Sequence, residues 1–367
     1  MEETAREEEM PQIVQVLEAF KQASQDIRQH HSPDSPAVKA LLELQNILSS
    51  QDPNLSTLSD HINRLKNLLY SLNHSTGLRS LITRPLSTHS LTRLAANIHS
   101  EIQAWIDRET LQTLKTTLKT THHPLLLHLL TQFQQRLSQG FNRELQDLVL
   151  NFKLFPSLQS LLLDDKSSIP VRERTGSAIA ALIRFNKDVF VGQVLMGPTV
   201  RALVSMGSVS SIEVLCSLIR SIRSPFVDEI ESNGEIPNVI ALLDSEDLQL
   251  RVFGFECVLE VGYFGRKEAV EAMLKEGLVK KLVELQRSEK GGDLIEFEKE
   301  GFGGYLERHP FASCVARFAV QLEVGEGLRQ REKRAFKPEI LVRVREACVS
   351  DAQAATIVAE VLWGSSP

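Results

Sequence analysis

The sequence of 367 residues lacks the features that mark membrane and secreted proteins. No uninterrupted apolar run approaches the roughly 18 residues that a transmembrane helix needs. The first ten residues include five glutamates, the opposite of the basic start of a secretory signal. We therefore expect no membrane insertion, and a location in the cytosol with the nucleus as a second compartment.

Cysteine is scarce. The four cysteines show no CxxC spacing and fall in predicted helices of the second half of the chain: Cys216, Cys257, Cys314 and Cys348. Metal sites and disulfide frameworks both use closer or more regular cysteine spacing. The pattern favours four free thiols, buried as small residues, in a reducing compartment.

Charge of one sign is not in excess, because the formal net charge is only −6. The strong basic excess of a general nucleic-acid binder is therefore missing, and we expect no nucleic-acid partner. All ten histidines except His309 lie in the first 150 residues. His122, His123 and His128 come closest to a cluster, but offsets of 5 and 6 do not bring two imidazoles onto one helical face. We expect solvated histidines and no metal.

Catalytic constellations are missing too. Gly291-Gly292 and Gly301-Phe-Gly-Gly have neither the preceding strand nor the Lys-Ser/Thr of a phosphate loop, so residues 287–310 are predicted to be an insertion loop. No nucleophile with an oriented base is recognisable. The sequence thus predicts no enzymatic activity, no cofactor and no small-molecule substrate.

What the sequence does contain is a helical unit between Gly234 and Leu285. Pro237 suits a first helical turn, and the apolar face behind it should end near Asp244. Asp244 or Ser245 is expected to cap the next helix. That helix carries Gly254, which costs about 1 kcal/mol against Ala and makes sense where a neighbouring helix approaches closely.

A short third helix, Lys267 to Glu276, is predicted to stop at Gly277 in a left-handed cap. A unit of this size cannot bury its own apolar faces, so it needs stacked copies. We aligned copies of the helix that begins at Pro237 by their first helical turn. The positions that correspond to Pro237 are Pro156, Thr199 and Val279. The intervals of 43, 38 and 42 residues lie near the period of about 40 to 47 residues of armadillo and HEAT repeats.

The run from Asn233 to Arg251, Asn-Gly-Glu-Ile-Pro-Asn-Val-Ile-Ala-Leu-Leu-Asp-Ser-Glu-Asp-Leu-Gln-Leu-Arg, followed by a long helix, resembles the armadillo repeat. The resemblance covers about residues 150 to 362 and implies a right-handed α-solenoid of stacked three-helix repeats. The whole chain resembles plant armadillo proteins with an N-terminal helical domain like that of U-box ubiquitin ligases, but no U-box is recognisable.

We therefore predict an all-α chain in two parts. Residues 1–150 should form a helical bundle, and residues 151–367 about four armadillo-like repeats with capping helices at the C-terminal end. The bundle helices are expected near residues 11–29, 36–44, 54–72, 88–119, 124–133 and 141–150. The last repeat helix is expected at 311–323, then a solvated basic connector at 329–337 and closing helices at 338–363.

In armadillo proteins the third helix of each repeat lines the concave groove, and import receptors carry Trp and Asn there. At the corresponding positions this sequence has neither residue, so binding of a conventional import signal is not expected. The groove positions that follow from the resemblance are Ser177, Ala181, Ser217, Ser221, Glu256, Glu260, Arg317 and Gln321. Glu256 and Glu260 form a like-charge i, i+4 pair. Either these two glutamates bind a Lys or Arg of a partner, or they belong to an ordinary solvated helix face.

These features predict a non-enzymatic scaffold that binds another protein through the solenoid groove. The alternative is an adaptor related to U-box ubiquitin ligases, without a catalytic module of its own. Both follow from architecture rather than from a chemical site.

Overall fold

The computed structural model describes residues 60–64, 67, 79–119, 123–293 and 302–363, and these residues contain helices and turns but no β-strand. The helices are α4 (Arg79–Thr117), α5 (His123–Ser138), α6 (Arg143–Asn151), α7 (Leu154–Leu163), α8 (Ile169–Phe185), α9 (Lys187–Leu195), α10 (Thr199–Met206), α11 (Val209–Ile222), α12 (Ser224–Ser232), α13 (Ile236–Ala241) with the 3₁₀ turn η2 (Leu242–Asp244), α14 (Leu248–Phe264), α15 (Lys267–Lys275), α16 (Leu278–Gln286), α18 (Phe302–Arg308), α19 (Cys314–Val324), α20 (Gln330–Ala347) and α21 (Asp351–Trp363).

The contacts divide the chain into two units, which are described separately. One unit contains α4 and α6, and the other contains α5 and everything from α7 onward. The N-terminal helices predicted near 11–29 and 36–44 lie outside the described residues. The boundary predicted at residue 150 stays a prediction, although the contacts group α5 with the repeats because it packs on α8.

In the first unit, α4 buries one stripe of side chains at helical spacing. Leu94, Ile98, Ile102 and Ile106 are all buried, as the sequence predicts. The helix begins at Arg79 rather than near Thr88. Near its end the ammonium of Lys115 lies 5.5 Å from the centroid of the Phe152 ring. Cap chemistry sets the start of α6, where the Asn142 side chain accepts a hydrogen bond from the Leu145 N–H.

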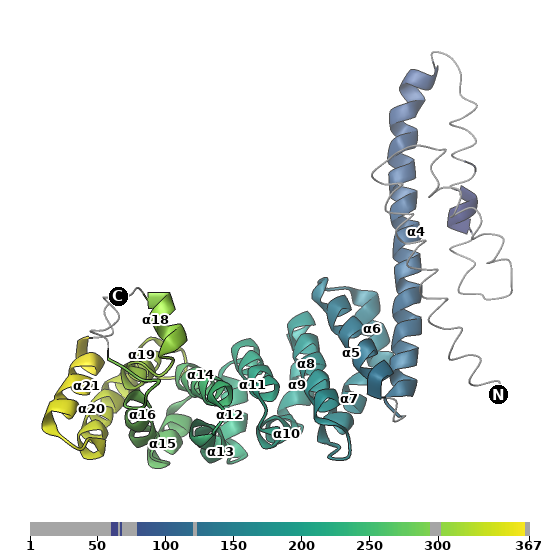
Figure 1. Ribbon diagram of the computed structural model, residues 1–367. Coiled ribbons are helices and arrows are strands. Elements are labelled where there is room, and N and C mark those ends of the chain that lie inside the picture. Colours follow the sequence, from purple (N-terminus) through teal and green to yellow (C-terminus); the bar gives the residue numbers. More distant parts are fainter. Residues whose placement is uncertain (1–59, 65–66, 68–78, 120–122, 294–301, 364–367) are drawn as a thin grey trace. The chain divides into compact units, whose positions relative to one another are not determined.

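The second unit is a solenoid of stacked helix triplets (Figure 1). The long third helix of each triplet packs on the third helix of the next, in the order α5, α8, α11, α14, α19 and α21. Second helices stack likewise, α7 on α10 and α10 on α13, and first helices do so in the order α9, α12 and α15. The predicted all-α solenoid is confirmed.

The central repeat shows why the sequence folds this way. Pro237 lies in the first turn of α13, and Gly277 adopts φ +77° where α15 stops, both as predicted. A Cβ built at Gly254 would lie 2.8 Å from the Cβ of Leu242, so a close approach does require this glycine. One expectation was wrong: Asp247 caps α14, accepting from the Gln249 N–H at 2.8 Å. Asp244 instead accepts from Lys281 of the next repeat.

The last repeat differs from the sequence-based expectation in the predicted insertion loop 287–310, which contains the helix α18, and at two helix starts. Ser313 adopts φ +46°, so α19 begins at Cys314 rather than Phe311. The basic run is helical and not a connector, because α20 begins at Gln330 and continues through Pro338. Its buried residues Phe336, Ile340 and Val344 keep a helical period on both sides of that proline. By its place between two third helices, α20 substitutes for the separate first and second helices of other repeats.

A buried polar cluster holds the end of the solenoid together. The Glu360 carboxylate of α21 accepts from Gln286 Nε2 at 2.7 Å and from Ser313 Oγ at 3.1 Å. All three residues are at least nine-tenths buried. Because a buried charge is tolerated only where hydrogen bonds compensate its lost hydration, this cluster fixes α21 against α16 and the segment before α19.

No single described helix is long and apolar enough to cross a membrane. The pair α9 and α10, bent by 72° at a short break, passes the same test by length and composition only. Both helices belong to the repeats, where Phe190, Val194, Val200 and Leu203 are fully buried.

Candidate functional site on the third helices

The candidate site is the face of α8, α11, α14 and α19 that carries the predicted groove residues, here called the third-helix surface. Consecutive third helices lie side by side, so residues about one repeat apart in sequence become neighbours. All predicted groove residues except the buried Ala181 are partly exposed on this surface. The repeats therefore do bring these positions onto adjacent helices.

The serines of this surface are engaged within the chain. Ser177 Oγ donates to the Glu173 carbonyl at 3.0 Å, and Ser221 Oγ donates to the Ser217 carbonyl at 2.8 Å. Such bonds to the preceding helical turn are common for serine in helices. Ser217 Oγ also accepts from Arg184 Nη1 at 2.8 Å, which links α11 to α8.

Glu260 pairs with a residue of its own chain. Arg220 Nε of α11 donates to Glu260 Oε1 of α14 at 2.7 Å, and this hydrogen bond raises the pKa of Arg220. The carboxylate of Glu260 is therefore neutralised within the chain. For Glu260, one of the two glutamates for which the sequence left open either a partner's cation or a solvated face, the cation is Arg220 of the same chain.

Glu256 is different, although it lies one turn earlier on the same helix. It is half-buried, and the described part of the chain gives its carboxylate no hydrogen bond or ion pair. Its negative charge adds to the larger effect of Glu260 in raising the pKa of Arg220, and it only partly opposes the burial that lowers the pKa of Arg317. Glu256 thus has unused acceptor capacity in the middle of the third-helix surface.

Arg317 is not an open cation of the third-helix surface, because it is bonded within the chain. Its guanidinium lies 4.7 Å from the Phe255 ring centroid, and Nη1 donates to the Pro310 carbonyl at 2.6 Å. Burial is the main cause that lowers the pKa of Arg317. Phe311 packs edge-on against Phe255 at 6.3 Å, so the residues before α19 cover this part of the surface. Gln321, one turn further, is half-buried with no side-chain partner among the described residues.

Sequence reasoning missed Arg184 and Arg220, which connect neighbouring repeats. A signal was available, because Arg220 precedes Glu260 by 40 residues, which is one repeat. Gln134 and Arg174 are also 40 residues apart, and Gln134 Nε2 donates to the Arg174 carbonyl at 2.9 Å. In a solenoid, complementary side chains one period apart predict a contact between adjacent third helices.

The thiols are free, and three of the four are buried. Burial raises the pKa of Cys314 to about 12, and its Sγ–H donates to the Leu282 carbonyl at 2.9 Å. The hydrogen bond with Cys216, followed by burial, raises the pKa of Cys257. Within the described residues no group of three or more His, Cys, Asp or Glu side chains could hold a metal ion.

No protein-family model and no curated protein matches the chain. Among solved structures, it is similar to the designed armadillo repeat protein YIII(Dq)4CqI, with 14% identity over 68% of this chain and 98% of that one and a TM-score of 0.45. The designed armadillo repeat protein YIII(Dq.V1)4CPAF in complex with peptide (KR)4 matches at 16% identity, the same coverage and a TM-score of 0.43. The all-α solenoid is established by the helix order and third-helix contacts of the chain itself.

Proposed function

We propose that this chain is a non-enzymatic scaffold that binds a segment of another protein along the third-helix surface. The observation that carries the proposal is Glu256, a half-buried carboxylate without a hydrogen bond or ion pair among the described residues, on a surface where Glu260 and Arg317 already have partners within the chain. Leaving such an acceptor partly desolvated costs free energy. A Lys or Arg of a bound segment would recover that cost.

The neighbours of Glu256 favour an extended segment over a compact ligand. Ser177, Ser217 and Gln321 lie on three other third helices and keep acceptor or donor capacity. Groups at repeat intervals along a row of parallel helices match successive residues of an extended chain. We infer a basic segment because Glu256 is the group left to be paired.

The adaptor alternative, a relative of ubiquitin ligases without its own catalytic module, has no distinguishing feature among the described residues. It predicts co-purification of ubiquitin-conjugation components, which a plain scaffold does not. Residence in the cytosol or nucleus belongs to the same proposal, and imaging of a fluorescently tagged chain tests it.

The test is affinity purification with mass spectrometry on the native chain, Glu256→Lys and the matched control Glu284→Lys. Glu284 is an exposed residue of α16 outside the third-helix surface, so its reversal makes the same change of net charge. We expect Glu256→Lys to lose a specific partner that Glu284→Lys keeps, with unchanged helical circular dichroism in both. Equal partner sets for all three proteins would contradict binding at this surface.

A further inference from the structure

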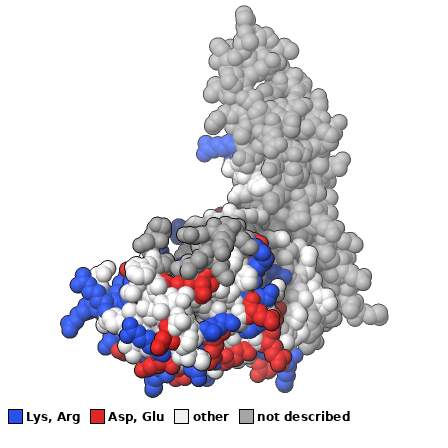
Figure 2. Space-filling view, turned by 60° about the vertical axis from the view of Figure 1, so that its left-hand side comes forward, with Lys and Arg blue, Asp and Glu red and all other residues white. Residues whose placement is uncertain are grey.

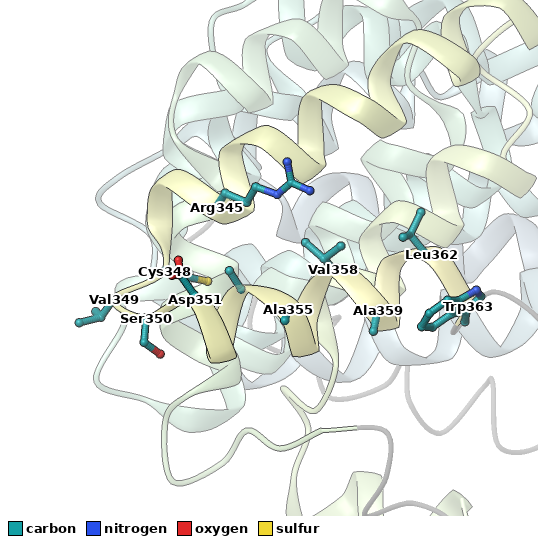
Figure 3. Close-up of a pocket in the computed structure, with 11 residues that line it drawn as sticks. Arg345, Cys348, Val349, Ser350, Asp351, Ala355, Val358, Ala359, Leu362 and Trp363 are labelled. Carbon is teal, nitrogen blue, oxygen red and sulfur yellow. The ribbon is translucent and has the colours of Figure 1, made fainter.

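The end of the solenoid carries a second surface, unrelated to the third-helix surface. The hairpin of α20 and α21 borders an open hollow of about 690 Å³. The residues that line this hollow are here called the end surface, and they include Arg345, Val349, Asp351, Ala355, Leu362 and Trp363. Figure 3 shows Arg345 reaching from α20 toward α21, and Val358 and Leu362 pointing from α21 toward α20.

Large apolar side chains are exposed on the end surface. Val349 is 94% exposed, Trp363 75% and Leu362 43%. Figure 2 turns this end of the solenoid forward and shows uncharged side chains interspersed with Lys, Arg, Asp and Glu side chains. Val349 precedes the first turn of α21, and Leu362 and Trp363 are its last two residues, so the exposed apolar side chains lie at both ends of this helix. Exposed large apolar side chains grouped on one element favour an interaction site.

Repeat geometry explains why this surface is apolar. Each interior third helix is packed between two others, as α14 is between α11 and α19. Among the described elements, α21 packs mainly on α19 and α20 and is bonded to α16 through Glu360. The side of α21 that lines the hollow, with Ala355 and Leu362, has the small and apolar composition of a packed third helix. Such a composition favours a covered face.

Two opposite charges lie in this apolar setting. Arg345 and Asp351 both line the hollow, and neither has a hydrogen bond or ion pair within the described part of the chain. The hollow thus offers one unpaired cation and one unpaired anion. A covering surface of a single charge sign would satisfy one group and bury the other without a partner, which is costly.

A second copy of the same surface satisfies both groups. In a two-fold symmetric interface, if residue i contacts residue j of the other copy, then j also contacts i. Arg345 of each copy would then meet Asp351 of the other, giving two ion pairs around apolar contacts of Val349, Leu362 and Trp363. We propose that the end surface is an isologous dimer interface between two copies of this chain.

This inference goes beyond the proposed function, since dimerisation at the end surface leaves the third-helix surface free. A dimer would present two third-helix surfaces to one partner, and linked sites raise the apparent affinity without new contacts. The two proposals fail independently, because Glu256 lies on α14 and the end surface involves only α20 and α21.

Sedimentation equilibrium of the full chain, in reducing buffer so that Cys348 cannot cross-link copies, tests the proposal. We expect a monomer–dimer equilibrium. Arg345→Asp and Asp351→Arg should each weaken it by about tenfold or more, because like charges then face each other twice. An equimolar mixture of the two variants should dimerise again, since one carries two negative and the other two positive groups at these sites.

Trp363→Ala should also weaken the dimer, whereas the matched control Met196→Ala, at a 91% exposed residue between α9 and α10, should not. Circular dichroism checks that each variant stays folded. Three results would overturn the proposal: a monomer up to millimolar concentration, a dimer indifferent to both charge reversals, or a mixture that stays monomeric. Binding of the native monomer to phosphatidylserine vesicles, lost in Arg345→Asp, would assign the surface to a membrane instead, with exposed Arg331 and Arg334 of α20 contributing.

Discussion

Arg220 and Glu260 form an ion pair of 2.7 Å between two adjacent third helices, although they are 40 residues apart in sequence. The pair is partly solvated, so we expect a coupling energy of about 0.5–1 kcal/mol. A double-mutant cycle of Arg220→Ala and Glu260→Ala, measured by urea unfolding, gives this value. The coupling should decrease at high salt. Strictly additive single effects would show that the pair contributes nothing.

Gly254→Ala should destabilise the protein even though alanine is the better helix former. Alanine normally gains about 1 kcal/mol over glycine in a helix. Here its Cβ would approach the Leu242 Cβ to 2.8 Å, so η2 or α14 would have to shift. Gly192→Ala in α9 is the matched control, because a Cβ there has nothing within 4 Å, and it should stabilise. Thermal unfolding of both variants measures the difference, and a stabilising Gly254→Ala would contradict the close approach.

Alkaline pH should weaken the fold partly through Cys314. Burial raises its pKa from 9.0 to about 12, so folding favours the neutral thiol. The stabilisation is complete below pH 9 and is lost as the pH rises toward 12, because the unfolded state releases the proton first. Urea unfolding between pH 8 and 11 should show a smaller decrease in the free energy of unfolding for Cys314→Ala than for the native chain. Equal slopes would indicate that another group titrates.

Arg317→Ala should cost about 2–3 kcal/mol of stability, because it removes a cation–π contact and a short hydrogen bond to Pro310. Arg184→Ala is the control, since exposed Arg184 makes one hydrogen bond to Ser217, and its cost should stay below about 1 kcal/mol. Urea unfolding compares the two variants. Arg317→Lys should recover little, because an ammonium lacks the planar guanidinium face. Equal costs for Arg184 and Arg317 would show that the segment around Pro310 is held by other contacts.

Helix identity in the central repeat was predictable from local chemistry. Pro237 predicts a helix start because its fixed φ suits the first turn, and Gly277 predicts a helix end because glycine readily adopts a positive φ. The structure confirms both. Gly254 was informative for the opposite reason, since a residue that weakens its helix needs a neighbour to explain it. Such signals depend on one residue and its immediate surroundings.

The candidate site was less predictable, because its properties depend on neighbours one repeat away. The resemblance placed Glu260 on a third helix but could not show that Arg220 neutralises it. Nor could it show that Pro310 and Phe255 enclose the guanidinium of Arg317. The start of α20 was predicted wrongly because a proline such as Pro338 usually marks the beginning of a helix. In the structure the helix continues on both sides of Pro338, since Phe336 and Ile340 are both buried against the repeats.

The buried cluster of Gln286, Ser313 and Glu360 has a consequence for folding kinetics. Contacts between neighbouring third helices close loops of about 40 residues, whereas Gln286 and Glu360 are 74 residues apart. The longer loop costs about 0.5 kcal/mol more chain entropy, and contacts of greater sequence separation form more slowly. Interior repeats can therefore assemble pairwise before this cluster closes. During refolding, we expect α21 to be the last helix to gain protection from hydrogen exchange.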